Sequence, residues 1–519
     1  MTVHTTRVIR GPRRARPPTA RTAAATIATA GLALLAACSA SPSSTGSGGS
    51  PNTRGSVNSA SAISYSRCMR SRGVPDYPDP DSSGQLPKIS PANEAQLGAS
   101  DSQFNAAQAA CQHLWPYQAP ASVTASPASG PLLPTADPFY RWSRSLARDV
   151  PGTILRTRAI AVVEAGGPAT PVKVTQLLYV TTDELGRRTA SVVTVLQPPG
   201  KAPPAITRLV SYQTAYDALG AQCDPSYTLQ TGTQGQMPLI LRYVAAGDTV
   251  VTADYEGEDL AYGAGQQYGY ETLDAIRAAE KWLGVPEVST PVGMVGYSGG
   301  SIATEFASEL ARAYAPDLDI VGVAEGGIPV DPIHNLAYID HPGSDWSGHI
   351  AAWLDGLARG FGIPDLQRYL TPQGIAAVDA DQTRCISDVA GLTTGQLFKP
   401  QYQDITKVPV LVRILDHLIM SRTGTPRAPL FTGTGLSDPT GDGVIVAKDV
   451  QELAYTYCHR GIPVEFHIYK GLSHIHAGLP FLEQAQTFLT QRFENLHFQN
   501  GCSDISPGNS IAPVPAPAS

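Results

Sequence analysis

The stretch Gly296-Tyr297-Ser298-Gly299-Gly300 places a serine between glycines at the spacing glycine-x-serine-x-glycine. The apolar run 291–295 before it predicts a buried strand, and residues 301–306 after it predict the start of a helix. Small residues suit such a strand-to-helix turn, because its strained backbone presses against neighbouring segments. Free N–H groups at the start of the helix would also face negative charge that develops on a bound oxygen. This context predicts a nucleophilic Ser298; the alternative is a passive serine in a glycine-rich turn.

Strands and helices alternate on both sides of this turn. A β-hairpin is predicted over 174–180 and 190–196, followed by buried strands that helices separate. The expected strands are 206–212, 249–254, 292–297, 320–325, 429–433 and 464–469, and the clearest helices are 270–283, 301–314, 448–458 and 482–493. This alternation is typical of an α/β fold with a mostly parallel sheet covered on both faces. Between 331 and about 427 the alternation is lost, which predicts a helical cap inserted at the edge of the sheet.

A nucleophilic serine needs a base, and the base needs a carboxylate that orients it. In sheets with this kind of turn, the acid and then the histidine follow the serine along the chain. The loop Ser437-Asp438-Pro439-Thr440-Gly441-Asp442-Gly443 comes directly after the predicted strand 429–433. We expect Asp442 to be the acid. The alternative is Asp438, whose other expected role is to cap a turn or a helix.

The candidate base lies one helix and one strand further on, in Gly471-Leu472-Ser473-His474-Ile475-His476-Ala477. We expect His474 to be the base because it comes first after the strand and turn, and His476 is the alternative. The two histidines do not predict a metal site, since no third ligand lies near them in the sequence. Neither a metal nor a cofactor is therefore expected.

Composition narrows the class of protein. Of the 519 residues 42% are hydrophobic and 16% charged, which excludes an intrinsically disordered chain. The formal net charge of -7 argues against a general nucleic-acid binder, which would be basic. The length leaves room for one large catalytic domain with appendages.

The N-terminus predicts export. Residues 1–37 contain six arginines and no acidic residue, and the short apolar stretch 23–37 is typical of a signal peptide. It ends in Leu35-Ala36-Ala37-Cys38, which resembles a bacterial lipobox, so Cys38 is expected to carry a lipid anchor. The alternative is an ordinary signal peptide cleaved near Ala37. The general secretory route is favoured over twin-arginine export, because no hydrophobic residues closely follow the arginine pair 13–14. The predicted location is the outer side of the cell membrane, or the medium.

Six further cysteines remain after Cys38, and an even number in an oxidising compartment favours disulfides over metal ligation. The layout of the domains suggests the pairs Cys68–Cys111, Cys223–Cys385 and Cys458–Cys502. Six cysteines allow 15 connectivities, so the pairing stays open.

The chain divides into six segments by composition. Residues 1–37 form the signal peptide, 38–61 a flexible tether rich in Ser and Gly, and 62–117 a small disulfide-linked helical module. In that module helices are expected over 65–72 and 93–114. A linker over 118–134, the catalytic domain over 135–502 and a disordered tail over 503–519 complete the chain.

Residues 135–500 resemble the secretory lipase family. The segments that carry the resemblance surround the Ser298 turn on both sides. They are Pro138-Phe139-Tyr140, Gln176-Leu177-Leu178-Tyr179, Ser211-Tyr212-Gln213-Thr214 with Asp217, Cys223-Asp224-Pro225-Ser226-Tyr227, Ala253-Asp254-Tyr255-Glu256-Gly257 and Glu325-Gly326-Gly327-Ile328-Pro329. The resemblance implies an α/β-hydrolase with a helical lid that hydrolyses acyl glycerols and similar esters without a metal.

The resemblance also implies roles for single residues. Ser298 would be the nucleophile, Asp442 the orienting acid and His474 the base. The oxyanion hole would consist of the Gly299 N–H and Asp217, which must be protonated to donate a hydrogen bond. The alternative for Asp217 is a loop cap.

The expected activity is therefore hydrolysis of lipid or acyl esters through a Ser-Asp-His triad and an acyl-enzyme. A serine peptidase on the same fold is one alternative. The other is a non-catalytic lipoprotein that binds a surface through residues 62–117.

Overall fold

The computed structural model describes residues 59–80, 97–99, 103, 107, 110–111, 130–164, 169–200, 207–386 and 391–515. The predicted signal peptide lies outside these residues, as does Cys38. Most residues of the predicted tether, of the predicted helix 93–114 and of the predicted linker 118–134 also lie outside them. No helix in the described ranges is long and apolar enough to span a membrane.

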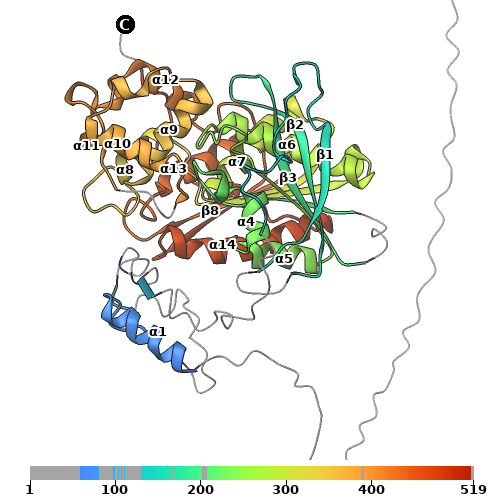
Figure 1. Ribbon diagram of the computed structural model, residues 1–519, viewed down its shortest axis with the longest axis horizontal. Coiled ribbons are helices and arrows are strands. Elements are labelled where there is room, and N and C mark those ends of the chain that lie inside the picture. Colours follow the sequence, from blue (N-terminus) through green and yellow to red (C-terminus); the bar gives the residue numbers. More distant parts are fainter. Residues whose placement is uncertain are drawn as a thin grey trace, which may run out of the picture. The chain divides into compact units, whose positions relative to one another are not determined.

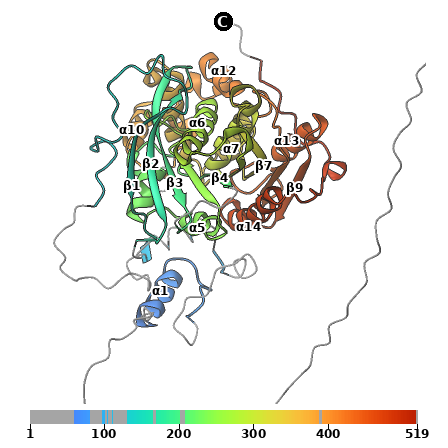
Figure 2. The ribbon, with the colours of Figure 1, turned by 90° about the vertical axis from the view of Figure 1, so that its right-hand side faces the viewer.

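A nine-stranded sheet forms the centre of the large domain, with strand order β1-β2-β3-β5-β4-β6-β7-β8-β9 (Figures 1 and 2). The strands are β1 (Ile154–Ile160), β2 (Lys173–Thr182), β3 (Arg188–Gln197), β4 (Leu209–Gln213), β5 (Thr249–Ala253), β6 (Pro291–Tyr297), β7 (Asp319–Gly326), β8 (Leu430–Leu436) and β9 (Val464–Lys470). From β5 to β9 neighbouring strands are parallel, whereas β1, β2, β3 and β5 pair antiparallel. The expected α/β class with a mostly parallel sheet is confirmed.

Helices cover both faces of the sheet. The helices of the scaffold are α4 (Pro225–Thr231), α5 (Met237–Ala245), α6 (Gly265–Leu283), α7 (Gly299–Tyr314), α13 (Ala447–His459) and α14 (His474–Phe493). Apolar residues of α5 and α14 pack on one face in one hydrophobic core, and those of α6, α7 and α13 pack on the other in a second core. Figure 1 shows α5 and α14 on the opposite side of the sheet from α6 and α7. The strands between the edge strands β1 and β9 are mostly buried on both faces, as is typical of a sheet covered by helices.

The predicted cap lies between β7 and β8. Its helices are α8 (Pro332–Ile339), α9 (His349–Phe361), α10 (Pro372–Asp381), α11 (Thr394–Leu397) and α12 (Pro409–His417). They gather at one end of the sheet (Figure 1) and share a hydrophobic core with α7 and α13. This insertion is called the cap below.

The small N-terminal unit contains α1 (Ser59–Ser71), which covers the helix expected over 65–72. Tyr65 and Met69 of this helix pack with Val74 and Tyr77, and the disulfide Cys68–Cys111 closes the unit. A segment with so little apolar surface gains stability from such a cross-link.

Two elements differ from expectation. Helix α14 begins at His474 rather than near 482, although Pro480 lies inside it. The tail was expected to be disordered, yet residues 503–515 lie along the domain. The backbone N–H of Gly508 donates to Glu452 of α13 at 2.8 Å, and that of Val514 donates to Asp416 of α12 at 3.0 Å.

Candidate active site

Ser298 lies on a sharp turn between β6 and α7. Its φ of 56° and ψ of -128° are rare for a residue with a side chain, and its N–H donates to the Gly326 carbonyl at 2.9 Å. The glycines at positions 296 and 300 are required because neighbouring backbone atoms leave no room for a side chain. A Cβ at Gly296 would lie 2.1 Å from the Gly300 oxygen, and one at Gly300 would lie 2.1 Å from the Gln213 oxygen. The turn therefore has the strained, tightly packed form that the sequence predicts.

His474 and Asp442 meet Ser298 at this end of the sheet. Nε2 of His474 lies 2.7 Å from Oγ of Ser298, and Nδ1 lies 3.0 Å from Oδ2 of Asp442. The other oxygen of Asp442 accepts the N–H groups of Val444 at 3.1 Å and Ile445 at 2.7 Å. These bonds fix the carboxylate while leaving Oδ2 for the imidazole. The structure thus brings the expected acid, base and serine into one chain of hydrogen bonds.

The two alternative residues lie elsewhere. Oδ1 of Asp438 accepts the N–H groups of Thr440 at 2.6 Å and Gly441 at 3.0 Å, which is the turn-capping role expected for it. Nδ1 of His476 lies 2.7 Å from the Ser473 hydroxyl, on the neighbouring turn of chain. In the described residues neither side chain is hydrogen-bonded to Ser298.

Asp217 faces the start of α7 from the loop after β4. Burial raises the pKa of its carboxyl to about 7, although His474 and a backbone hydrogen bond from Gly299 oppose the shift. Its φ of 40° is strained, and the adjacent Ala218 N–H donates to buried Glu256 at 3.3 Å. A carboxyl with this pKa holds its proton in part at neutral pH, so it can donate a hydrogen bond.

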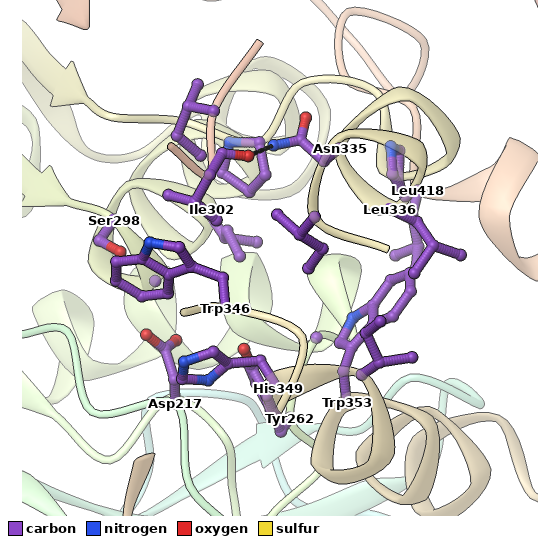
Figure 3. A pocket seen from close by; sticks show the side chains of 18 of the residues that line it. Asp217, Tyr262, Ser298, Ile302, Asn335, Leu336, Trp346, His349, Trp353 and Leu418 are labelled. Carbon is purple, nitrogen blue, oxygen red and sulfur yellow. Dashed lines mark hydrogen bonds between the residues drawn. The ribbon is translucent and has the colours of Figure 1, made fainter. Parts of the chain in front are cut away.

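Helix α8 of the cap supports the loop that carries Asp442, a contact that the sequence analysis did not find. The Tyr338 hydroxyl accepts the N–H of Gly443 at 3.0 Å and donates to Asp438 at 2.5 Å. Nδ2 of Asn335 donates to the Val444 carbonyl at 2.7 Å (Figure 3). Neither residue has a local motif, because the two segments are about a hundred positions apart.

An apolar cavity opens beside Ser298 (Figure 3). Its volume is about 900 Å³, including the open mouth. About half of the lining residues belong to the cap, mostly to α8 and α9. The others include Ile302 and Phe306 of α7 and residues of the loops that carry Asp217 and Asp442. Trp346 of the cap packs edge-on against the His474 ring, with ring centroids 5.2 Å apart. A hydrocarbon chain bound here would lie next to the serine.

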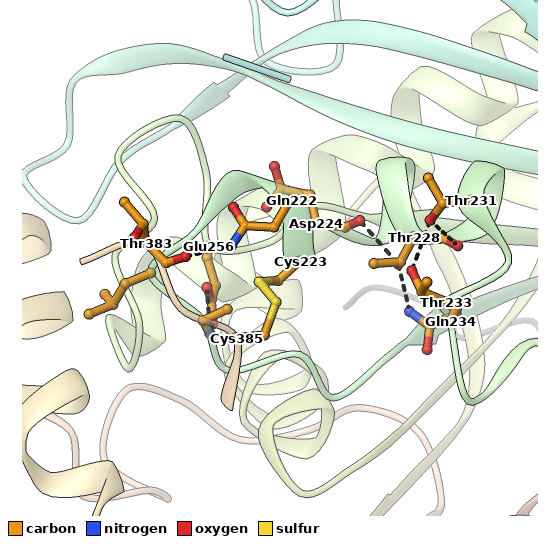
Figure 4. The surroundings of a disulfide bond; sticks show 12 residues. Gln222, Cys223, Asp224, Thr228, Thr231, Thr233, Gln234, Glu256, Thr383 and Cys385 are labelled. Atoms are coloured by element: carbon orange, nitrogen blue, oxygen red, sulfur yellow. Dashed lines mark hydrogen bonds between the residues drawn. A yellow bond between two sulfur atoms is a disulfide. The ribbon is translucent and has the colours of Figure 1, made fainter. Parts of the chain in front are cut away.

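The six cysteines after Cys38 form disulfides, in the pairs Cys68–Cys111, Cys223–Cys385 and Cys458–Cys502 that the layout suggested. The second pair joins the scaffold to the cap (Figure 4). Beside it, the Leu219 N–H donates to the Arg384 carbonyl at 3.3 Å and Gln222 donates to the Thr383 carbonyl at 2.5 Å. The cap is therefore tied to the loop that carries Asp217.

No group of three or more His, Cys, Asp or Glu side chains in the described ranges is arranged to hold a metal ion.

The sheet order, the strained serine turn and the cap define the class: this is an α/β-hydrolase. The sequence model of the secretory lipase family matches residues 223–501. The chain is 32% identical over 390 residues to the "Probable inactive lipase MT1628" of Mycobacterium tuberculosis, covering 70% of this chain and 83% of that protein. It is 30% identical over 405 residues to Lipase A of Arthroderma benhamiae, covering 72% and 82%.

The solved structures agree with the sequence relatives. Lipase A of Candida antarctica in its closed state superposes with a TM-score of 0.64 at 25% identity, covering 75% of this chain and 93% of that one. This chain belongs to the secretory lipase family, as its motifs predicted.

Proposed function

We propose that the protein is a serine ester hydrolase that cleaves lipid or other acyl esters through an acyl-enzyme. The observation that carries this proposal is the chain of hydrogen bonds from Asp442 through His474 to Ser298. His474 removes the Ser298 proton as Oγ attacks the ester carbonyl, and it then protonates the departing alcohol. Water repeats the attack with the same base and releases the acid.

The negative oxygen of each tetrahedral intermediate needs donors that are already in place. In the proposal these are the Gly299 N–H, at the start of α7, and the protonated carboxyl of Asp217. Oδ2 of Asp442 accepts the hydrogen bond of His474 Nδ1 and holds the ring in the orientation that points Nε2 at the serine. The apolar cavity would take the acyl chain, which favours long hydrocarbon esters over peptides.

One relative favours a second candidate function. The printed name of the mycobacterial relative calls that protein an inactive lipase. A non-catalytic binding protein on this scaffold would keep the cavity but would not activate the serine. The presence of Ser298, His474 and Asp442 within hydrogen-bonding distance favours the enzyme for this chain.

The test uses the full chain, exported and with its disulfides intact. Hydrolysis of p-nitrophenyl esters of increasing acyl length is compared for wild type, Ser298→Ala and the exposed control Ser503→Ala. A fluorophosphonate probe reports independently whether Ser298 is activated. Cleavage and labelling that only Ser298→Ala abolishes support the proposal. A folded protein that neither cleaves esters nor reacts with the probe supports the binding protein, and cleavage of peptides alone supports a peptidase.

Export and a lipid anchor at Cys38 are part of the same proposal. Three disulfides suit an oxidising compartment, and an anchor would hold the enzyme near water-insoluble substrates. We expect the exported protein to partition into detergent and Cys38→Ala to release it into the aqueous phase. Aqueous partitioning of the wild type would contradict the anchor.

A further inference from the structure

A histidine lies inside the apolar cavity. His349 is the first residue of α9, and its ring stacks on Trp346 with centroids 5.0 Å apart and planes inclined by 31°. The same indole packs edge-on against His474, with centroids 5.2 Å apart. His349 therefore lies one indole away from the base of the proposed triad and lines the same cavity as Ser298 and Asp217 (Figure 3).

One ring nitrogen of His349 is not satisfied by the described part of the protein. Its Nδ1 is buried and has no hydrogen-bond partner in the described part of the chain. The neighbouring wall is apolar, with Ile302, Ile350, Leu418 and Met420. Burial, and secondarily the electrostatic interaction with His474, lowers the pKa of His349 to about 4, so the His349 imidazole is neutral at neutral pH. A neutral imidazole offers one donor and one acceptor.

Two further unsatisfied polar atoms line the same cavity, Oδ1 of Asp217, already assigned to the proposed oxyanion hole, and Oδ1 of Asn335. Oδ1 of Asn335 is buried without a partner, while Nδ2 of that amide is held by the Val444 carbonyl at 2.7 Å. Leaving buried polar groups unpaired is costly, and a cavity for a plain hydrocarbon chain has no use for them. Neither His349 nor Asn335 is charged at neutral pH, so a neutral group suits each of them, and for the imidazole this is a group that both donates and accepts. A hydroxyl has this chemistry.

Resting on the proposed ester hydrolysis, we propose that His349 binds a hydroxyl group of the substrate, so that the preferred ester carries a hydroxyl near its reacting carbonyl. The hydroxyl can lie on the acyl chain, as in a 3-hydroxyacyl ester, or on the alcohol, as in the monoester of a diol. In both cases the hydroxyl would supply a hydrogen bond that the protein does not make to Nδ1 of the ring. An unsubstituted chain would leave this nitrogen unpaired.

The experiment measures kcat/KM for two matched pairs of esters with the full-length, disulfide-intact protein. The first pair is ethyl 3-hydroxydecanoate and ethyl decanoate, and the second is 2-hydroxyethyl decanoate and ethyl decanoate. We expect wild type to prefer the hydroxylated member of one pair by roughly tenfold. The pair that shows the preference identifies the side of the ester that carries the hydroxyl.

Three variants test whether His349 causes the preference for the hydroxylated ester. His349→Leu keeps the size of the side chain but removes both ring nitrogens, and we expect the ratio within the preferred pair to fall to about one. His349→Gln restores a donor and an acceptor and is expected to recover part of the ratio. His341→Leu makes the same change at an exposed position of the cap and is expected to keep the wild-type ratio.

The outcomes separate this proposal from the one on which it rests. A wild type that cleaves no ester overturns both. A wild type that cleaves esters without preference, or a preference that survives in a folded His349→Leu protein, overturns only the role of His349. Loss of preference in His341→Leu as well would show that the cap as a whole, and not His349, sets the ratio.

Discussion

The carboxyl group of Asp217 lies so close to the backbone of Gly299 that no side chain fits between them. A Cβ atom at position 299 would stand 1.6 Å from Oδ1 of Asp217. The two residues come from different elements, since Asp217 follows β4 and Gly299 begins α7. The absence of a side chain at Gly299 therefore allows the Asp217 carboxyl to lie against the start of α7.

Gly299→Ala should damage catalysis without preventing folding. The new methyl group displaces the Asp217 carboxyl, and we expect kcat on acyl esters to fall by about 10²–10³-fold, as when an oxyanion donor is lost. Gly235→Ala is the matched control, because no heavy atom lies within 4 Å of its Cβ position. Wild-type kcat in Gly299→Ala would show that the reaction does not use Asp217 where the structure places it.

Asp217 should give the enzyme an alkaline limit. Its raised pKa of about 7 means that the carboxyl is protonated below that pH and loses its proton as the pH rises through it. Since only the protonated form donates to the oxyanion, kcat should decline above about pH 7.

Asp217→Asn supplies the control for this limit, because its amide donates at every pH and asparagine tolerates a positive φ. The pH dependence of kcat is measured for both proteins between pH 5 and 9. We expect the decline in wild type only. An identical decline in Asp217→Asn would assign the limit to another group.

The loop 437–443, called the acid loop below, contains two aspartates, Asp438 and Asp442, whose roles substitution should distinguish. Asp442→Asn removes the charge that orients His474, and we expect kcat to fall by about 10⁴-fold. Asp438→Asn alters a turn cap on the exposed side of the loop and should leave kcat near the wild-type value. Ester hydrolysis by the two purified variants checks this. A larger loss in Asp438→Asn would reverse the assignment.

Tyr338 should act on the rate through the acid loop. Tyr338→Phe removes the acceptor of the Gly443 N–H and the donor to Asp438, each worth about 1 kcal/mol. We expect kcat to fall about fivefold, with KM unchanged because Tyr338 does not line the cavity. Tyr455→Phe on α13 is the control. A change in KM alone would mean that Tyr338 contacts substrate.

The disulfide between scaffold and cap should contribute more stability than the one near the C-terminus. Cys223 and Cys385 are 162 positions apart, whereas Cys458 and Cys502 are 44 apart. By chain entropy, the longer loop should make the first cross-link worth roughly 1 kcal/mol more. Urea unfolding of the two double-serine variants tests this order. Equal urea midpoints for the two variants would show that the length of the closed loop does not determine how much each disulfide stabilises the protein.

Much of the sheet could be predicted from the sequence because buried parallel strands form uninterrupted apolar runs, as in 291–297. Strand β1 could not be predicted, since it alternates arginines with half-buried residues at the edge of the sheet. The start of α14 was also hidden, because Gly478 and Pro480 interrupt its helical pattern. Local sequence thus predicts central elements better than edges and irregular helices.

The residues of the candidate site also fall into two groups, those that the sequence predicts and those that it does not. Ser298, Asp442 and His474 follow strand ends, so topology alone brings them to one edge of the sheet. Tyr338 and His349 belong to the cap, where no strand fixes their position. Only the folded cap shows that Tyr338 supports the acid loop and that His349 lines the cavity.

One insertion supplies about half of the residues that line the cavity, while the serine, acid and histidine all lie outside it. Heritable changes in the cap, away from Tyr338 and Trp346, can therefore alter what the protein recognises without altering the residues of the proposed triad. Members of such a lineage would be expected to diverge in substrate range long before they diverge in mechanism. A whole cap exchanged between relatives would carry the donor's preference with it.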